Sequence, residues 1–147
     1  MSEIKLLNID ELERIIPFAA EFISESGEDI PFNENHFKKT WKELYEVDTG
    51  RIIIAEKEGV VVGVLGFIVY NDLLCGELRS SETFWFVRKA DRGIGLKLLD
   101  AFEDLSKEMG VKNILMMHLK RLMPEKLKSI YLKRGYREIE TQYIKGL

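Results

Sequence analysis

The chain has 147 residues, of which 46% are hydrophobic and 32% are charged, and its formal net charge is −3. This length fits one domain, expected to span residues 1–147, and the composition is that of a folded globular protein. The acidic charge argues against a general nucleic-acid binder, so no nucleic-acid partner is expected. One cysteine and two histidines offer no zinc-binding spacing, so no metal is expected either.

The N-terminal sequence lacks the charged and then apolar pattern of a signal peptide, and no stretch is as long as a membrane span. Cys75 has no second cysteine with which to form an internal disulfide. We therefore expect a cytoplasmic protein without a membrane partner.

The first third of the chain predicts a short strand and two helices. Residues 4–7 form the strand, and Asn8 or Asp10 is the expected N-cap of the helical stripe that follows. Pro17 bends or divides this first helix. Apolar side chains at helical spacing within residues 37–45 predict the second helix.

Two β-rich runs come next, at residues 51–56 and 60–70, and the turn at 57–59 between them predicts an antiparallel hairpin. A further strand is expected within residues 77–87. The apolar end of that strand, residues 84–87, leads directly into a turn that contains two glycines.

After this turn the chain alternates helix and strand. A helix begins near Gly93 and ends at Gly110. It is followed by a strand at residues 113–119, a helix over residues 124–134 and a last strand at residues 137–144. The face of the first of these helices that is expected to pack on the sheet consists of Ile94, Leu98, Ala101, Phe102, Leu105 and Met109.

These elements predict an α/β (α+β) fold with a mixed, mostly antiparallel central sheet flanked by about four helices. The hairpin supplies antiparallel pairing. The helical crossovers late in the chain allow a later strand to lie parallel to its predecessor.

The segment Arg92-Gly93-Ile94-Gly95, between the apolar run and the helix, is the strongest candidate for a ligand site. Glycine lets a ligand approach the main chain, and the first turn of a helix presents N–H groups and a positive dipole end to anions. The turn therefore favours a phosphorylated ligand. Tight turning and close helix packing are the alternative reasons for two glycines here.

Three segments, residues 86–87, 92–99 and 129–136, resemble the GNAT family of N-acetyltransferases, which move an acetyl group from acetyl-coenzyme A (acetyl-CoA) to an amine. The resemblance spans nearly the whole chain and is specific over residues 87–136. Residues 136–145 also look like the last strand of small bacterial or phage-encoded members. The resemblance implies a GNAT-like fold, acetyl-CoA as cosubstrate and a small-molecule or protein amine as acceptor.

In this family the turn before the central helix binds the pyrophosphate of the coenzyme, and the end of the preceding strand pairs with its pantetheine arm. Two departures stand out: Ala90 occupies a place where the family usually has Arg or Gln, and residues 120–125 lack the usual asparagine. By resemblance the cofactor-binding residues are Phe86 and Val87, through their main chain, and Arg92, Gly93, Ile94, Gly95, Leu96 and Lys97.

The resemblance also makes Tyr131 the acid that protonates the thiolate of the leaving coenzyme. A base must take a proton from the incoming ammonium, and Glu82 is preferred to Glu77 for this role. The strand register is open, and a shift of one residue turns a side chain to the other face. His118, expected near the end of its strand, is the alternative base because imidazole titrates near neutrality. Without the resemblance, the sequence favours a packing role for Tyr131, and solvated surface positions for Glu82 and Glu77.

Two other functions are open. A non-catalytic protein of this fold, which binds coenzyme A or a protein partner, is compatible with the departures at Ala90 and residues 120–125. A dinucleotide binder is the weakest alternative, because Gly93-Ile94-Gly95 is not followed by the third glycine of that motif.

One sequence feature bears on the acceptor amine, namely an acidic loop between the first two predicted helices. Its carboxylates attract a cationic amine or are simply hydrated. Tyr136 and Tyr143 in the last segment offer a contact for a homodimer. The acidic residues are Glu25, Glu28, Asp29 and Glu34.

Overall fold

The computed structural model describes residues 2–27, 31–119 and 123–147. The chain forms two compact units, Met1–Met117 and His118–Leu147. Among the described residues, the first unit contains the sheet and three α-helices, and the second contains one α-helix and the C-terminal segment. No helix in these described ranges has the length and hydropathy needed to span a bilayer.

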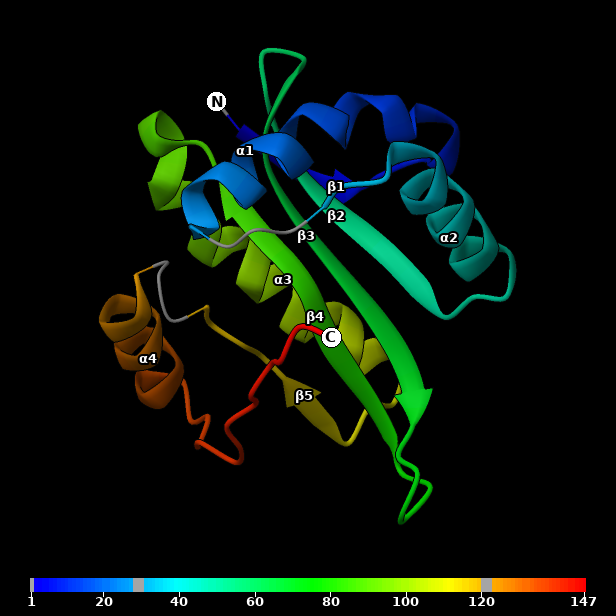
Figure 1. The fold of residues 1–147 in the computed structure, drawn as a ribbon, viewed down its shortest axis with the longest axis vertical. Coiled ribbons are helices and arrows are strands. Elements are labelled where there is room, and N and C mark those ends of the chain that lie inside the picture. Colours follow the sequence, from blue (N-terminus) through cyan, green and yellow to red (C-terminus); the bar gives the residue numbers. More distant parts are fainter. Residues whose placement is uncertain (1, 28–30, 120–122) are drawn as a thin grey trace. The chain divides into compact units, whose positions relative to one another are not determined.

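Five strands in the described part of the chain form one sheet, in the order β1-β2-β3-β4-β5 (Figure 1). Strands β1 to β4 pair antiparallel, and β5 lies parallel to β4. The predicted mixed, mostly antiparallel sheet is confirmed. From β1 to β5 the strands are Ser2–Leu6, Gly50–Lys57, Val60–Asn71, Leu78–Val87 and Asn113–Leu115.

The turn between β2 and β3 is formed by Glu58 and Gly59, whose φ values are 53° and 78°. Positive φ at both central residues defines a type I′ turn, whose twist matches that of the flanking strands. Gly59 adopts this conformation without strain because it has no Cβ. The predicted hairpin is confirmed.

A short 3₁₀ helix, η1 (Ile9–Ile15), precedes α1 (Ile16–Ser26). The side chain of Asn8 accepts a hydrogen bond from the N–H of Asp10, as predicted for an N-cap. Pro17 lies in the first turn of α1, where its missing N–H costs no helical bond. Pro17 therefore divides the predicted helical stripe into two helices.

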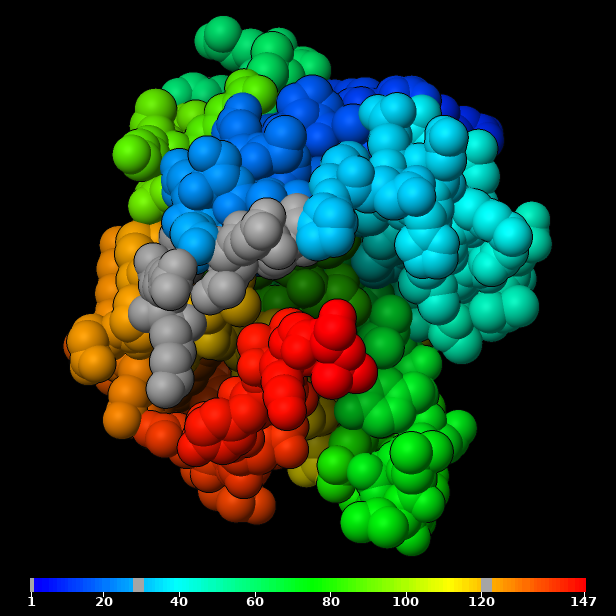
Figure 2. All heavy atoms as spheres, in the orientation of Figure 1, coloured from blue at the N-terminus to red at the C-terminus, as the bar shows by residue number. Residues whose placement is uncertain are grey.

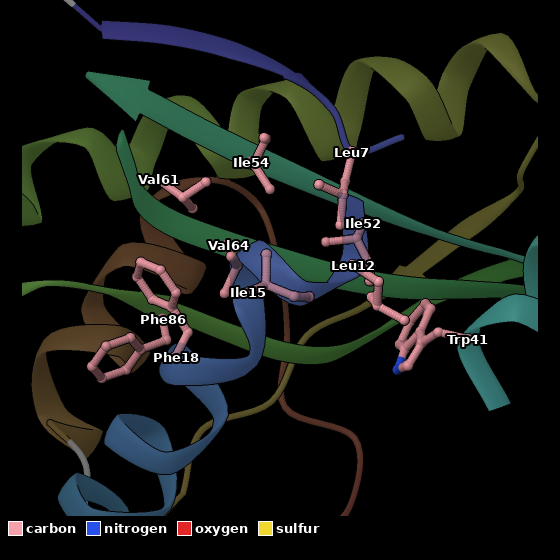
Figure 3. Packing of buried hydrophobic residues seen from close by; sticks show 10 residues of the cluster. All are labelled: Leu7, Leu12, Ile15, Phe18, Trp41, Ile52, Ile54, Val61, Val64 and Phe86. Carbon is pink, nitrogen blue, oxygen red and sulfur yellow. The ribbon is translucent and has the colours of Figure 1, made fainter. Parts of the chain in front are cut away.

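Helix α2 (Glu34–Glu46) begins at Asn33, whose side chain accepts a hydrogen bond from the N–H of His36. Its apolar face buries Trp41. Helices α1 and α2 lie on one face of the sheet (Figure 1). The core cluster on this face, drawn in Figure 3, consists of Leu7, Leu12, Ile15, Phe18, Trp41, Ile52, Ile54, Val61, Val64 and Phe86.

Helix α3 (Gly95–Glu108) covers the other face of the sheet (Figure 1). Phe102 packs there on Phe67 of β3, with ring centroids 4.8 Å apart. Gly110 follows the helix end with a φ of 78°, as predicted for a C-terminal glycine. The prediction that Met109 faces the sheet was wrong, because it lies past the last helical turn and is 37% exposed. The buried residues of α3 are Gly95, Leu98, Leu99, Phe102 and Ser106, and Ile94, directly before the helix, is also buried.

The helix begins two residues later than Gly93, the start that the sequence predicted. Residues Lys89–Ile94 form a second 3₁₀ helix, η2, directly before α3. The N–H of Gly95 donates to the carbonyl of Arg92, which is the bond of a tighter 3₁₀ turn. Asp91, with φ −120° and ψ 15°, adds a kink. The glycine turn therefore lies in η2 and the first residue of α3.

Strand β5 is shorter than the predicted strand of residues 113–119, because its ladder with β4 ends at Leu115. Two residues further on, the N–H of Met117 donates to the carboxylate of Glu82, a side chain of β4. His118 consequently lies beyond the strand, and the prediction that it stands near the strand end was wrong.

In the second unit, α4 (Pro124–Lys133) confirms the helix predicted over residues 124–134. The strand predicted at residues 137–144 is not formed, and these residues have no regular structure. A strand needs a hydrogen-bonded neighbour, and the described residues of this unit contain no other strand. Tyr143 is accordingly 91% exposed.

Candidate active site

Neither glycine of the turn before α3 is required by the fold. Gly93 has no positive φ, and a Cβ added to it would meet no atom within 4 Å. Gly95 has helical φ and ψ of −56° and −39°, and an added Cβ would lie 3.5 Å from the Trp85 ring, an ordinary contact. Tight turning and close packing therefore explain neither residue. Gly93 is exposed, so its main chain is open to a ligand.

The start of α3 has the electrostatics of an anion site. No side chain caps this helix and its first turn contains no acidic residue, so the positive dipole end is not neutralised there. Leu96 and Lys97 are exposed, and Lys97 adds a positive charge. Ile94 is only 8% exposed, so its side chain belongs to the core. The N–H of Gly95 donates to the carbonyl of Arg92 within η2, and Gly95 itself is buried.

Arg92 is held at the junction of α1, β4 and η2. Its Nη2 donates to Glu25 Oε2 at 2.6 Å, and its Nε donates to the carbonyl of Val87 at 3.4 Å. The two side chains of the ion pair are 26% and 27% exposed. The carboxylate of Glu25, considered in the sequence as an attractor for a cationic amine, is therefore paired with a cation of the chain itself.

Arg88, the first residue after β4, was not singled out by sequence reasoning. Its guanidinium lies 4.8 Å from the centroid of the Phe18 ring, and its Nη2 is 3.8 Å from Glu21 Oε1. The sequence feature that could have identified Arg88 is its position four residues before Arg92. Together the two arginines place positive charge between the end of β4 and helix α1.

Strand β4 extends well past its pairing with β5. The ladder covers residues 79–81 of β4, whereas the strand continues to Val87. Within the described residues, no strand pairs with this edge from Glu82 onward. Such an edge can bind an extended ligand through main-chain hydrogen bonds. Phe86 and Val87 are 4% and 8% exposed, so their side chains belong to the core.

The space-filling view shows one face of the first unit, on which atoms of α1 and α2 lie over the sheet (Figure 2).

A β-bulge in β4 sets the direction of Glu82. Phe67 of β3 opposes Glu82 and Gly66 opposes Phe84, so Thr83 is an extra residue. Phe67 packs on α3, and Glu82 points to the same face because directly opposed residues share a face. Phe84 instead packs on Trp41 of α2. The bulge thus fixes the register that was open in the sequence.

Glu82 is a buried acid, 4% exposed. Burial raises the pKa of Glu82 to about 8, and the hydrogen bond from Met117 opposes this rise. A carboxyl group that titrates near neutrality is suited to accept a proton from an ammonium. Glu77, the other acid considered, is exposed and precedes β4. Glu82 therefore remains the preferred candidate for the base.

Tyr131 and His118 belong to the second unit. Tyr131, on α4, is 8% exposed, and its ring centroid lies 5.6 Å from that of Tyr136. The carbonyl of Tyr131 also accepts a hydrogen bond from the N–H of Tyr136 at 3.0 Å. The catalytic roles of Tyr131 and His118 stay predictions.

Part of the predicted acidic loop, Glu28 and Asp29, lies outside the described residues, as do residues 120–122 of the segment without the expected asparagine. Glu34 is 3.8 Å from Lys38 Nζ within α2. In the described ranges, no three His, Cys, Asp or Glu side chains are grouped so that they could hold a metal ion.

The model of the acetyltransferase (GNAT) family matches residues 12–136 of this chain. The protein therefore belongs to the GNAT acetyltransferase family, as the resemblance of its sequence indicated. No curated protein matches the chain in a sequence comparison.

Solved structures of acetyltransferases have the same fold. A predicted acetyltransferase of Clostridium acetobutylicum, solved with acetyl-CoA, is 12% identical with a TM-score of 0.82, covering 99% of this chain and 96% of that one. An aminoglycoside acetyltransferase from an uncultured soil metagenomic sample is 19% identical, with a TM-score of 0.78 and coverage of 100% and 99%. The ribosomal-protein-alanine N-acetyltransferase of Brucella melitensis biovar Abortus 2308 is 16% identical, with a TM-score of 0.76 and coverage of 99% of both chains. At these identities the likeness establishes the GNAT-like fold.

Proposed function

We propose that this protein is an N-acetyltransferase that transfers the acetyl group of acetyl-CoA to an amine by direct attack, while both substrates are bound. Family membership supports acetyl transfer. The observation that carries the use of acetyl-CoA is Gly93, which is exposed and which neither a turn nor a contact requires to be glycine. A diphosphate that approaches the main chain accounts for it. The acceptor is the amine of a small molecule or a protein.

The residues at the turn and on β4 fit such a cosubstrate. The uncapped start of α3 favours an anion, and Arg92 and Lys97 add positive charge beside it. The main chain of Phe86 and Val87, on the edge of β4 that no described strand covers, pairs with the pantetheine arm. Bound acetyl-CoA supplies the activated acetyl group, and these residues hold and orient it.

The chain itself supplies the groups that move protons. The carboxylate of Glu82 takes a proton from the ammonium of the acceptor, and its raised pKa makes it a stronger base than an exposed glutamate. His118 is the alternative base. By resemblance, the hydroxyl of Tyr131 gives a proton to the sulfur of the departing coenzyme.

Titration calorimetry of the full chain with coenzyme A, acetyl-CoA and NAD tests the proposal, together with a thiol-release assay over a panel of amines. We expect both coenzymes to bind, NAD not to bind, and thiol release to require an amine. Binding of coenzyme A without release by any amine would favour the non-catalytic alternative. Absence of coenzyme binding by the folded protein would contradict the proposal, and binding of NAD alone would favour a dinucleotide binder.

The role of Tyr131 has its own test. Because the phenol is needed when the thiol departs and not when the coenzyme binds, Tyr131→Phe is expected to lower turnover about tenfold or more at near-normal coenzyme affinity. Tyr136→Phe is the matched control, since it removes the hydroxyl of the neighbouring ring. Equal turnover of wild type and Tyr131→Phe would remove Tyr131 from the mechanism.

A further inference from the structure

Glu25 and Arg92 form an ion pair between residues 67 positions apart in the chain. The pair joins the last turn of α1 to η2, with Nη2 and Oε2 2.6 Å apart. Arg92 is also the arginine of the glycine turn, where a diphosphate would need a cation. An acidic side chain of the protein thus occupies donors of the arginine that is assigned to an acidic ligand.

The end of α1 is built so that Glu25 stays close to Arg92. Ser26, the next residue, is fully buried, and its hydroxyl donates to the carbonyl of Ile23 at 2.8 Å. Gly27 then ends the helix with a φ of 70°. These contacts fix the backbone on the C-terminal side of Glu25, so the carboxylate is not carried by a loose surface segment.

The neighbouring pair, between α1 and the residue that precedes η2, is much looser. Glu21, one helical turn before Glu25, is 3.8 Å from Arg88, and the two side chains are 43% and 38% exposed. An exposed pair at this distance contributes little. The contrast identifies Glu25–Arg92 as the specific contact between α1 and the residues around the turn.

We infer that Glu25 is an internal competitor of the cosubstrate for Arg92, and that it lowers the affinity of the protein for coenzyme A. The inference rests on the proposed function, which places the diphosphate at the glycine turn. Carboxylate and diphosphate oxygens bind the same guanidinium donors. The Nη2 group that is bonded to Glu25 has to change partner when the diphosphate binds, and the released carboxylate then repels the incoming charge.

Neutralising Glu25 removes the competitor and leaves Arg92 in place. We expect Glu25→Gln to bind coenzyme A about fivefold more tightly than wild type, which is the scale of one partly exposed ion pair. Glu21→Gln is the matched control, because it makes the same change in the same helix and acts on Arg88 instead. Its affinity should stay within about twofold of wild type.

A double-mutant cycle separates competition for Arg92 from a general loss of negative charge. Titration calorimetry measures the affinity for coenzyme A of wild type, Glu25→Gln, Arg92→Gln and the double variant, with melting temperatures to confirm folding. Once Arg92 is replaced, Glu25→Gln is expected to have no further effect on affinity.

Three results would overturn the inference: unchanged affinity of Glu25→Gln, weaker affinity, or equal tightening with and without Arg92. Weaker affinity would mean that Glu25 holds Arg92 in place for the ligand. Each of these results leaves the proposed function standing, because the wild type still binds coenzyme A. Absence of binding by the folded wild type would instead overturn the proposed function and this inference together.

Discussion

Two glycine-containing regions of the first unit have opposite relations to the fold. At the β-bulge, a Cβ on Gly66 would lie 2.5 Å from the ring of Phe84, so packing requires a glycine there. At the turn before α3, a Cβ on Gly93 would meet nothing within 4 Å. In the sequence both glycines have an apolar residue beside them. The contacts around them separate a glycine that the fold needs from one that it does not need.

Glu82 lies beside the β-bulge, but like Gly93 it is not a residue that the packing of the fold requires. Buried charge is costly, and the raised pKa of Glu82 shows that its surroundings disfavour the carboxylate. A residue that burial penalises and that nevertheless lies beside the open edge of β4 is a candidate for chemistry. The predictions below test whether the residues that packing does not favour are the ones that function needs.

The largest effect is expected from Glu82→Gln. The amide keeps the shape of the side chain and can still accept the hydrogen bond from Met117, but it cannot take a proton. Turnover at neutral pH should fall by about 100-fold, the scale of general base catalysis, with coenzyme affinity little changed. Thiol-release kinetics with a reactive amine provide the measurement.

Glu77→Gln is the control for this substitution, since Glu77 is exposed and precedes the strand. It should have near wild-type turnover. The opposite pattern, with Glu77→Gln inactive and Glu82→Gln active, would transfer the base to Glu77. If neither variant lost turnover, His118→Gln would be the next variant to measure.

The second prediction concerns stability and pH. The pKa of Glu82 is raised from 4.5 to about 8 on folding, so the native state binds more protons than the unfolded state between these values. The favourable contribution of this group is complete below about pH 4.5 and is lost as the pH rises through about 8. The melting temperature of wild type should therefore fall relative to that of Glu82→Gln between pH 5.5 and pH 9. Parallel melting curves across this range would show that Glu82 is not buried as described.

The third prediction addresses the turn itself. Gly93→Ala should lower the affinity for coenzyme A about tenfold or more, because the methyl group projects into the space through which a ligand reaches the main chain. Stability should change by less than about 0.5 kcal/mol, since the methyl meets no atom of the protein. Calorimetry and thermal melting on the same samples measure both quantities. Normal affinity would show that the main chain at Gly93 does not contact the coenzyme.

Features that depend on local pattern could be predicted from the sequence. The hairpin follows from Glu58-Gly59 between two β-rich runs, and the N-cap follows from Asn8 before an apolar stripe. The place of the candidate turn, at the junction of β4 and α3, was also correct. In each case the determining residues lie within a few positions of one another.

Features that depend on distant partners could not be predicted. Strand β5 ends at Leu115, and two residues further on the N–H of Met117 bonds to the side chain of Glu82, which comes from another strand. Residues 137–144 have a strand-like pattern but no neighbouring strand among the described residues of their unit. The Glu25–Arg92 pair joins positions 67 apart. The spacing of neighbouring residues in the sequence does not indicate these contacts.

The smallest effect on ligand binding, and the sharpest control for the comparison, is expected from Gly66→Ala. The added methyl would lie 2.5 Å from the ring of Phe84 and 3.0 Å from Thr83 Oγ1, and Phe84 is itself packed against Trp41 and Phe37. Moving the ring should destabilise the protein by about 2 kcal/mol and lower its melting temperature by roughly 5 °C, while the folded fraction keeps near-normal affinity for coenzyme A. The same change from Gly to Ala would thus reduce stability at one position and binding at the other. If Gly66→Ala were as stable as Gly93→Ala, contact environment would not distinguish the two glycines, and the case for a ligand at Gly93 would lose its physical basis.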